Sequence, residues 1–323
     1  MKNYSFHYAR HSQLGVFCFG ENMILFLSVR ANNELIENMK AVYPLIRGEK
    51  QYISAMYPHN ETTKTKITEA IRKADTIVVD DYIGYLAGTN KRTIQLWHAS
   101  GAFKQFASSK LPCTKAIVSS EYCRKYYAGA FNISEKQVVA TGMPKTDWIF
   151  DDIETAKRRK RIKDKYNLAG RIILYAPTFR DTDRHSLNLP LDIEFDGTML
   201  ISKHPIISDI NISGIKSNVM VCNERTDELM AAADVMITDY SSVAFDWMLT
   251  GKPIGFYAYD LKEYVRGFWL DYSSLPNVVT TSKGLERLLN TDMECDYSGL
   301  ADRYMNRCDG HASERVAELI EEK

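Results

Sequence analysis

The sequence predicts an α/β fold in which two doubly wound domains face each other across a cleft. Three observations support this prediction. Short apolar runs alternate with amphipathic segments in the first half of the chain, a highly charged stretch at 151–168 interrupts them, and the alternation then restarts. A length of 323 residues is also more than one hydrophobic core comfortably serves.

In the first half, apolar runs predict strands at 23–29, 76–81, 92–98, 115–120 and 137–142. Apolar residues at helical spacing predict helices at 33–46 and 65–74. A third helix is expected after Ser120, which can cap it, and should close near Gly129. These segments make up the first predicted domain, residues 1–155.

The second half repeats the pattern in a second predicted domain, residues 156–305. Its strands are expected at 171–177, 198–205, 218–223, 234–240 and 253–260, with helices at 226–233 and 242–251. The tail from 296 onward is predicted to be helical, and 306–323 is assigned as a separate C-terminal helix.

The charged stretch between the halves carries seven Lys and Arg residues between 157 and 165. One interpretation is a solvated linker helix. The other is a basic patch that faces anionic lipid headgroups. The sequence alone leaves both open.

Composition and charge exclude several classes of protein. The 41 basic and 41 acidic side chains cancel, so the chain as a whole has no attraction for nucleic acid, although a local basic patch can still act. The six cysteines form no CxxC pair, which is typical of reduced thiols in a cytoplasmic protein. The start lacks the pattern of a signal peptide, and the longest apolar run is far below the ~20 residues of a spanning helix. Any membrane contact is therefore expected to be peripheral.

Histidines follow two of the predicted strands, one in each half. His98 comes directly after Trp97, and His204 stands between Lys203 and Pro205. Ligands of doubly wound sheets bind beyond the carboxyl ends of strands, so both imidazoles are expected at the cleft. There a histidine can take a proton from an alcohol or stabilise an anion. A purely structural role at a strand end is the alternative.

A candidate phosphate site follows another strand of the second half. Asp239, Ser241 and Ser242 stand at a strand-to-helix turn, where unpaired N–H groups and serine hydroxyls can hold phosphate oxygens. Simple capping of the helix by a serine is the alternative. Arg180 and Arg266 favour the phosphate interpretation if they reach the same cleft, because guanidinium groups suit phosphate oxygens.

Several common active-site motifs are missing from the sequence. There is no GxGxxG after a strand, no GxxxxGK[ST], no HExxH and no GxSxG, and no DxD stands where a sugar-nucleotide enzyme would hold a metal. His59, His185 and His311 are expected to be surface residues. No cofactor is firmly predicted, and a dependence on a divalent cation is left open.

A resemblance to a known family rests on segments that occur in this order: WHASGAFK, TGMPKTDW, ILYAPTFRD, ISKHP, ADVMITDYSSVAFDWM, KPIGFYAYDLKEYVRGFWLDY and DGHASERV. Together they resemble the CDP-glycerol glycerophosphotransferase family, which includes the teichoic acid primases and polymerases. The resemblance runs from about Ser28 to the C-terminus and is most specific between Tyr175 and Tyr272. It implies the GT-B architecture, two Rossmann-like domains with the active site between them, in agreement with the two series of strands and helices.

The resemblance implies a bacterial cell-wall transferase. Members move glycerol phosphate or ribitol phosphate from its CDP-activated form to a hydroxyl, and CMP leaves. The acceptor is expected to be a lipid-linked teichoic-acid or capsule precursor, either a polyol-phosphate chain or a glycan, and nucleic acid is not an expected partner. The enzyme would work in the cytoplasm, peripherally bound to the inner face of the cell membrane. Basic and aromatic residues of the first domain would meet the membrane, unless they form an ordinary solvated face: Lys104, Lys110, Lys115, Arg124, Lys125 and Tyr126.

The resemblance also assigns roles by position. His98 matches the histidine of the family's Trp-His-Gly motif and is the expected general base. His204 matches the Lys-His-Pro histidine and is expected to stabilise charge on the transferring phosphate. The other matching positions are expected to bind substrate: Trp97, Lys104, Pro177, Thr178, Arg180, Lys203, Asp239, Ser241, Ser242, Asp246, Asp260 and Arg266.

This chain departs from the family pattern in two places. The family's Trp-His-Gly-Thr-Pro-Leu-Lys stands here as Trp-His-Ala-Ser-Gly-Ala-Phe-Lys, over 97–104, which leaves the identity of the acceptor open. The sequence also lacks the long N-terminal extension of the larger polymerases, so both a primase and a short polymerase fit. The donor, glycerol or ribitol, and the oligomeric state are not determined by the sequence.

Two rival interpretations remain. A GT-B glycosyltransferase that uses a nucleotide sugar would employ the same fold and the same phosphate site. A non-catalytic nucleotide-binding module is the second rival, and the presence of both His98 and His204 argues against it.

Overall fold

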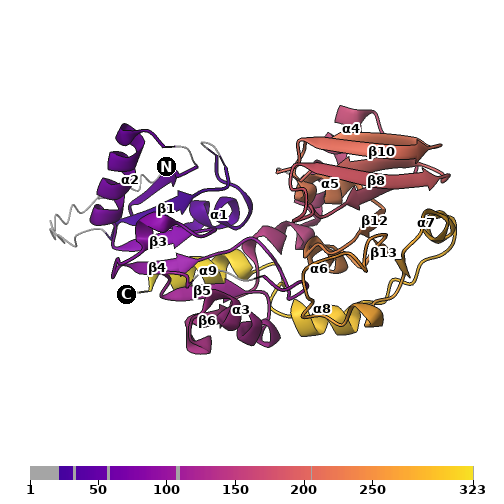
Figure 1. Cartoon of the computed structure of the whole chain (residues 1–323). Helices are drawn as coiled ribbons and strands as arrows, with labels where there is room; N and C mark the ends of the chain where they lie inside the picture. Colours follow the sequence, from indigo (N-terminus) through magenta and orange to yellow (C-terminus); the bar gives the residue numbers. More distant parts are fainter. Residues whose placement is uncertain (1–21, 32–33, 57–58, 107–109, 205, 323) are drawn as a thin grey trace, which may run out of the picture.

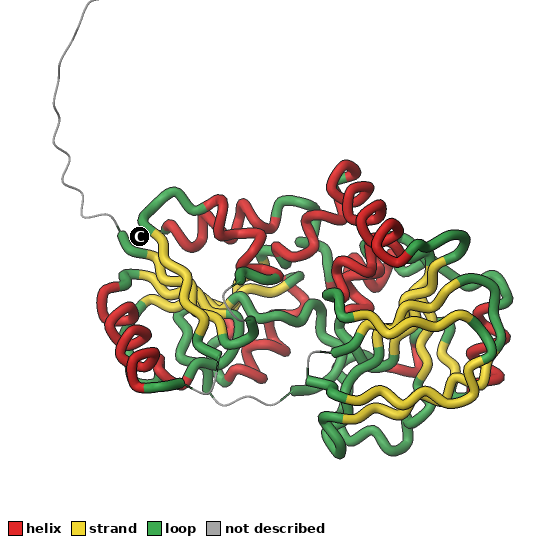
Figure 2. The backbone as a smooth tube through the Cα atoms, turned by 90° about the horizontal axis from the view of Figure 1, so that it is seen from above, coloured by secondary structure: helices red, strands yellow, loops and turns green. Residues whose placement is uncertain are grey.

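The computed structural model describes residues 22–31, 34–56, 59–106, 110–204 and 206–322. These residues form two lobes, and each lobe is built on a six-stranded sheet in which every pairing is parallel (Figure 1). Seen from above, the two sheets stand apart, with helices both on their outer sides and between them (Figure 2). The predicted α/β fold of two domains that face each other is confirmed.

The first lobe contains six strands in the order β2-β1-β3-β4-β5-β6. Every residue of β1 and β3 is buried, as expected for central strands of a parallel sheet covered on both faces. The second strand was not predicted, because its sequence KQYIS is half polar. The bounds are β1 (Ile24–Ser28), β2 (Lys50–Ser54), β3 (Thr76–Val79), β4 (Arg92–Gln95), β5 (Lys115–Val118) and β6 (Val138–Ala140).

Of the first two helices of the first lobe, one is shorter and the other longer than the periodicity predicts. Helix α1 (Glu37–Val42) gives way to the 3-10 turn η1 (Tyr43–Leu45), which contains a proline. Helix α2 (Glu61–Lys73) begins at Asn60, whose side chain accepts a hydrogen bond from the backbone N–H of Thr63 at 2.8 Å. Short turns complete this lobe: η2 (Gly84–Leu86), η3 (Glu121–Cys123) and η4 (Glu135–Gln137).

Helix α3 (Arg124–Phe131) runs past the predicted stop at Gly129. It ends instead where Asn132 adopts the left-handed conformation, with φ 51°. Asparagine is one of the few non-glycine residues that accept this conformation as a helix cap, so the prediction placed the end two residues too early.

The two lobes are joined by η5 (Pro144–Phe150) and α4 (Asp152–Tyr166). Helix α4 packs along α5 (Thr226–Ala232), and its basic side chains form ion pairs with acidic groups of the chain. Arg161 pairs with Glu228, Arg159 with Asp234 at 2.8 Å, and Lys165 with Glu224. These contacts favour the linker interpretation over a basic patch that faces lipid.

The second lobe contains six strands in the order β11-β9-β7-β12-β13-β14. Strands β7, β9, β12 and β13 are buried along their whole length. The bounds are β7 (Ile172–Ala176), β9 (Thr198–Ser202), β11 (Asn218–Cys222), β12 (Val235–Thr238), β13 (Ile254–Tyr257) and β14 (Val278–Val279), with helices α6 (Val243–Met248) and α7 (Ser282–Leu289) and the turn η6 (Tyr272–Ser274).

A separate two-stranded parallel ribbon covers one face of this sheet (Figure 1). It consists of β8 (Ser186–Ile193) and β10 (Asp209–Ile215). The alternate residues of β8 point inward and pack in one cluster with sheet residues such as Tyr175 and with α7. The prediction missed this ribbon, although the strict alternation of apolar and polar residues in β8 is a strand signal.

The C-terminal tail forms two helices, α8 (Ser298–Tyr304) and α9 (Ala312–Glu321). Helix α9 returns to the first lobe, where Val316 and Ile320 pack with Phe26 and Ile94 of the sheet (Figure 1). The chain therefore crosses between the lobes twice. Within the described residues, no helix is both long enough and apolar enough to span a membrane.

Candidate active site

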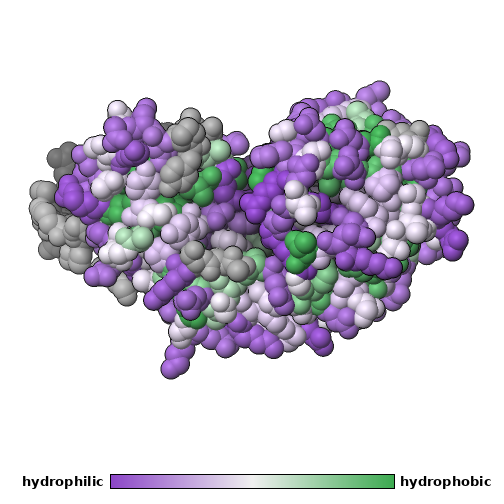
Figure 3. All heavy atoms as spheres, in the orientation of Figure 1, coloured by the Kyte–Doolittle hydropathy of each residue, from purple (hydrophilic) through white to green (hydrophobic). Residues whose placement is uncertain are grey.

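A cavity of about 450 Å³ lies between the two lobes. It opens from a notch that Figure 3 shows between them, with hydrophilic residues along it. The carboxyl ends of strands from both sheets supply its walls, as expected for ligand sites in doubly wound folds. The predicted residues that line it are His98, Lys203, His204, Ser241, Ser242 and Asp246.

His98 lies at the cavity because the chain turns sharply after β4. Trp97 adopts the left-handed conformation, with φ 50°, and its ring stacks on the His98 imidazole at 4.4 Å between centroids. Such a backbone costs about 1–3 kcal/mol in a residue other than glycine and tends to occur at functional sites. Buried Asn38 holds the turn by donating to the carbonyls of Leu96 at 3.1 Å and Trp97 at 2.9 Å.

The segment after His98 brings the two lobes into contact. Gly101 has φ 60°, and a Cβ atom there would lie 2.1 Å from the ring of Phe245 in the other lobe. Only glycine fits both the conformation and the space. Further along, Lys104 forms an isolated β-bridge with Phe268 of the second lobe.

The Nδ1 atom of His98 faces two oxygen atoms. It lies 3.5 Å from the carbonyl of Asp80 and 3.7 Å from the carboxylate of Asp81. Because both are acceptors, Nδ1 carries the proton of the neutral ring and Nε2 is left to accept one. Burial, with the positive charge of Arg30, lowers the pKa of His98 to about 3, so the ring is neutral near pH 7.

His204 has the opposite arrangement. The backbone N–H of Ile206 donates to its Nδ1 at 3.3 Å, so Nδ1 is an acceptor and the proton of the neutral ring sits on Nε2. The ring rests on Phe179, with 5.0 Å between centroids. Burial, with the positive charges of Lys104 and Arg30, lowers its pKa to about 4. Pro205, the last residue of the Lys-His-Pro motif, lies outside the described residues.

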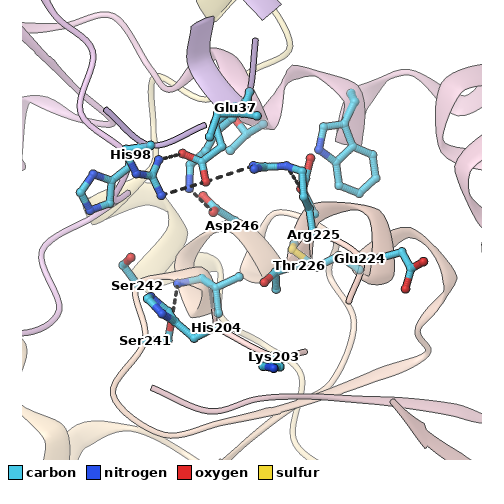
Figure 4. Close-up of a pocket in the computed structure, with 18 of the residues that line it drawn as sticks. Glu37, His98, Lys203, His204, Glu224, Arg225, Thr226, Ser241, Ser242 and Asp246 are labelled. Atoms are coloured by element: carbon cyan, nitrogen blue, oxygen red, sulfur yellow. Dashed lines mark hydrogen bonds and ion pairs between the residues drawn. The ribbon is translucent and has the colours of Figure 1, made fainter. Parts of the chain in front are cut away.

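The serines of the candidate phosphate site also reach the cavity. Ser241 and Ser242 line it beside His204, as Figure 4 shows. The hydroxyl of Ser241 accepts a weak hydrogen bond from the N–H of Val243 at 3.4 Å, and Ser242 makes no side-chain cap. Capping alone therefore does not account for both hydroxyls. Lys203 lines the same wall, but its ammonium group donates to the carbonyl of Ser208 at 2.9 Å.

Ion pairs cross the cavity from lobe to lobe. Glu37 of α1 pairs with Arg30 and, at 3.1 Å, with Arg225 of the second lobe (Figure 4). Lys145 pairs with Asp246 at 2.6 Å. Burial alone would raise the pKa of Glu37. The cations Arg30, Lys145 and Arg225 outweigh burial and lower this pKa to about 2.

A second group of predicted residues lies outside the cavity. Arg180 donates to buried Asp239 at 2.9 Å and to Asp260 at 2.9 Å, while the N–H of Thr178 donates to Asp239 at 2.9 Å. Arg266 pairs with Asp181 rather than with a cavity wall, at 2.7 Å. These arginines are engaged by carboxylates of their own lobe, and their assignment to the donor stays a prediction.

Lys104, Trp97 and Pro177 do not line the cavity. Lys104 lies near the group of Asp239 and Arg180, where burial and the neighbouring arginines lower its pKa to about 8. Its ammonium stands 5.5 Å from the centroid of the Phe179 ring. Trp97 stacks on His98, and Pro177 is buried at the end of β7.

Sequence reasoning missed six charged residues of the cavity: Arg30, Glu37, Lys145, Glu224, Arg225 and Asp227. Arg30 follows β1 and Lys145 follows β6, so the strand-end argument that found the histidines also reaches these two. Glu37 and Arg225 stand at the starts of helices in different lobes. Nothing in the sequence says that those two helix starts face each other. Within the described residues, no cluster of three or more His, Cys, Asp or Glu side chains could hold a metal ion.

The family follows from comparison with known proteins. Residues 20–322 match the family described as CDP-Glycerol:Poly(glycerophosphate) glycerophosphotransferase. The chain belongs to this family. The resemblance drawn from the motifs is therefore confirmed.

Relatives in this glycerophosphotransferase family include teichoic acid enzymes of two kinds. The poly(ribitol-phosphate) polymerase of Bacillus spizizenii is 31% identical over 94% of this chain, and the chain spans only 51% of that polymerase. The glycerol-phosphate primase of Bacillus subtilis is 31% identical over 76% of this chain and 73% of its own length. The wall teichoic acid polymerase TagF has the same fold, with a TM-score of 0.74 and 21% identity over 93% of this chain and 88% of the solved chain.

Proposed function

We propose that this glycerophosphotransferase-family chain transfers glycerol phosphate or ribitol phosphate from its CDP-activated form to a hydroxyl group and releases CMP. The acceptor is a lipid-linked teichoic-acid or capsule precursor. One observation carries the proposal beyond family membership. Two neutral histidines of opposite tautomer reach one cavity from opposite lobes, one able to accept a proton and one able to donate a hydrogen bond.

The chemistry is an in-line displacement at the β-phosphorus of the CDP-polyol. The acceptor oxygen forms a bond to this phosphorus while the bond to the bridging oxygen of CMP breaks, and the electron pair leaves with CMP. Nε2 of His98 takes the proton of the attacking hydroxyl, a step typically worth about 10²–10⁴-fold in rate. The histidine is available for this step because it is neutral before the reaction.

The second lobe offers donors to the negative charge of the phosphate. The Nε2–H of His204 and the hydroxyls of Ser241 and Ser242 lie on one wall of the cavity. Preorganised donors of this kind are typically worth about 10²–10³-fold each in kcat. Helix α6 is only six residues long, so we assign the effect to the side chains rather than to its dipole.

The test is CMP release from CDP-glycerol and from CDP-ribitol, each with a glycerol-phosphate-primed lipid acceptor. We expect release from one donor by the wild type and its loss in His98→Ala. The donor that works decides between glycerol and ribitol. A wild-type protein that binds CDP but releases CMP from neither donor would refute the proposed reaction.

The division of labour between the lobes is part of the proposal. Residues 1–155 would hold the acceptor and meet the membrane, residues 156–305 would hold the CDP donor, and 306–323 would be the C-terminal segment that contains helix α9. The position of His98 in the first lobe and of His204, Ser241 and Ser242 in the second supports this division. CDP titrated into His98→Ala and into Ser241→Ala should bind normally to the first and weakly to the second.

We also propose that the enzyme sits peripherally at the inner face of the cell membrane, in contact with anionic lipid. Lys104 is not part of the proposed membrane-contact surface, because it is largely buried between the lobes. Support comes from a neighbouring surface in which Lys125 lies 4.9 Å above the rings of both Tyr122 and Tyr126, and Arg303 lies 5.5 Å from that of Tyr122. Cations beside amphipathic rings suit an anionic lipid surface.

Vesicle flotation tests this location. Vesicles that contain phosphatidylglycerol should carry the protein upward in a salt-sensitive manner, and neutral vesicles should not. Lys125→Glu with Arg303→Glu should abolish flotation, whereas Lys64→Glu, a change on exposed α2, should not. Equal flotation of the protein with the two vesicle types would refute the membrane proposal and leave the proposed reaction unaffected.

A further inference from the structure

Two adjacent parallel strands bring a carboxylate next to the proposed base. Strands β3 and β4 pair with Val79 opposite Gln95, so their carboxyl ends lie side by side. Asp81 follows the end of β3 and His98 follows the end of β4. The Oδ2 atom of Asp81 lies 3.7 Å from Nδ1 of His98. Catalytic hydrogen bonds are often this long before a substrate binds and shorten when it does, so the two groups are within working reach.

The carboxylate of Asp81 is not engaged by a cation. Within the part of the chain that the structure describes, no lysine or arginine comes within ion-pair distance of it. Its Oδ1 atom accepts a hydrogen bond from the backbone N–H of Tyr82 at 2.6 Å. The Oδ2 atom is left to face His98, and the carboxylate is about one-third exposed, so it can keep its charge.

The other carboxylates near the ring are directed elsewhere. Glu37 forms ion pairs with Arg30 and Arg225. Asp80 turns its carboxylate to the hydroxyl of Ser28, which donates to it at 2.5 Å, and only its backbone carbonyl faces His98. Asp81 is therefore the acidic side chain that can answer a charge on this imidazole.

Buried Gln95 holds the carboxylate and the ring in position. Its side-chain N–H donates to the carbonyl of Asp81 at 3.1 Å, and its side-chain oxygen accepts from the N–H of Trp97 at 3.0 Å. One amide thus ties the segment after β3 to the turn that carries His98. Groups fixed in this way need little rearrangement when charge develops.

The proposed reaction creates a charge that the surroundings of His98 oppose. The neutral ring becomes an imidazolium when Nε2 takes the proton of the attacking hydroxyl. Burial and the positive charges of Arg30 and Lys145 disfavour that form, and they lower the pKa of His98 to about 3. The carbonyl of Asp80 can fix the tautomer, but it carries no net charge. A carboxylate close to Nδ1 favours the charged ring.

We propose that Asp81 is the carboxylate partner of His98: it accepts a hydrogen bond from Nδ1–H and stabilises the imidazolium during proton transfer. The proton of the hydroxyl goes to Nε2, the proton on Nδ1 stays there, and Asp81 takes up none. Asp81 is a positioning residue, since it acts through His98. This inference rests on the proposed function for the reaction and adds a residue that the motifs do not assign to the site.

Kinetics of two aspartates at opposite ends of β3 test the inference. Asp81→Asn removes the charge and keeps the shape, and should lower kcat by about 10–10²-fold with the KM for the CDP-polyol unchanged. Asp81→Glu should recover part of the loss, because it restores the charge. The control is Asp75→Asn, in which the replaced carboxylate accepts from the N–H of Met23 at 2.9 Å just before β3. This variant should keep its kcat.

NMR of the imidazole tests the contact itself and needs no turnover. In protein labelled with ¹⁵N-histidine, Asp81→Asn at pH 7 should move the Nδ1–H resonance of His98 upfield, because a charged acceptor makes the stronger hydrogen bond. The tautomer should stay the same, since the carbonyl of Asp80 remains. Unchanged resonances of His204 and unchanged CDP affinity show that the variant is folded.

The outcomes separate this inference from the proposed function. If the wild type releases no CMP but Asp81→Asn moves the Nδ1–H resonance, the reaction is wrong and the pairing of Asp81 with His98 is upheld. If the wild type releases CMP, His98→Gln loses this activity and Asp81→Asn keeps it, the reaction stands and the inference is overturned. An unmoved Nδ1–H resonance, or an equal loss of kcat in Asp75→Asn, also overturns it.

Discussion

His98 and His204 occupy equivalent places in the two lobes, each just beyond the carboxyl end of a parallel strand and each on the cavity wall. Burial, aided by nearby cations, lowers the pKa of both rings and keeps them neutral. They differ in what faces Nδ1. The oxygens of Asp80 and Asp81 face Nδ1 of His98, whereas the backbone N–H of Ile206 faces Nδ1 of His204.

This difference shows how a protein can give two identical side chains complementary tasks. The group at Nδ1 fixes the tautomer, and the tautomer decides whether Nε2 accepts a proton or donates a hydrogen bond. A single carbonyl or a single backbone amide beside Nδ1 is sufficient to fix the tautomer. The comparison makes opposite predictions for the same substitution at the two positions.

The largest effect is expected at His98. His98→Gln should lower kcat by about 10²–10⁴-fold, as much as His98→Ala, because an amide cannot take up the proton of the acceptor hydroxyl. The KM for the CDP-polyol should change little, since this ring serves the acceptor. Steady-state kinetics with the donor varied at saturating acceptor will measure both constants. Near wild-type turnover in His98→Gln would show that His98 is not the general base.

A somewhat smaller effect is expected at His204. His204→Ala should lower kcat by about 10²–10³-fold through loss of a hydrogen-bond donor to the phosphate. His204→Gln should recover part of this loss, because its amide N–H can stand where Nε2–H stood. The ratio of kcat between the glutamine and alanine variants is the measurement. A ratio near one at His204, or a large ratio at His98, would contradict the assigned tautomers.

Asn38 offers a way to disturb one histidine and leave the other alone. Asn38→Ala leaves the carbonyls of Leu96 and Trp97 without their buried donor, and should cost about 1–3 kcal/mol of stability. It should also lower kcat, because the turn that carries His98 loosens. Urea unfolding and kcat are measured together.

The second lobe provides a matched control for this variant. The side chain of Asn277 donates to the backbone carbonyl of Ile254 at 2.9 Å and to that of Glu294 at 2.7 Å, and it does not line the cavity. Asn277→Ala should lose comparable stability and keep its kcat. If both variants lose kcat in proportion to stability, Asn38 acts only through the fold.

The sequence predicted the histidines because the position of a strand end is a local property. An apolar run of four to six residues shows where a strand stops, and parallel strands bring their ends to one edge of the sheet. His98, His204, Ser241 and Ser242 were all located in this way. The same argument would have reached Arg30, which follows β1 by two residues.

Other features depend on contacts that no local pattern carries. Glu37 and Arg225 meet across the lobes, and their pairing follows from how two whole domains dock. Arg180 was assigned to the donor because arginine suits phosphate, but two carboxylates of its own lobe engage it. The sequence does not show whether an arginine pairs with a ligand or with an aspartate.

The smallest effect concerns pH, where the two histidines should behave alike. Half of the side chains of free histidine are protonated at about pH 6.5. Here burial disfavours the charged ring, and the pKa values fall to about 3 for His98 and about 4 for His204. The value of kcat/KM should therefore stay level from pH 8 to about 5 and decline only below that. In the unfolded chain the two histidines bind protons at a higher pH than the buried rings do. The free energy of unfolding should therefore fall as the pH drops from about 6.5 toward 4.

One neighbouring group can imitate a histidine in this profile. Burial raises the pKa of Asp80 to about 6, and its backbone carbonyl faces His98. A weak step near pH 6 would then report the charge of Asp80 rather than the protonation of a base. Asp80→Asn should erase such a step and leave the decline below pH 5 unchanged. A full loss of kcat/KM near pH 6.5 that survives in Asp80→Asn would mean that the histidines titrate normally, and that burial does not keep either ring neutral.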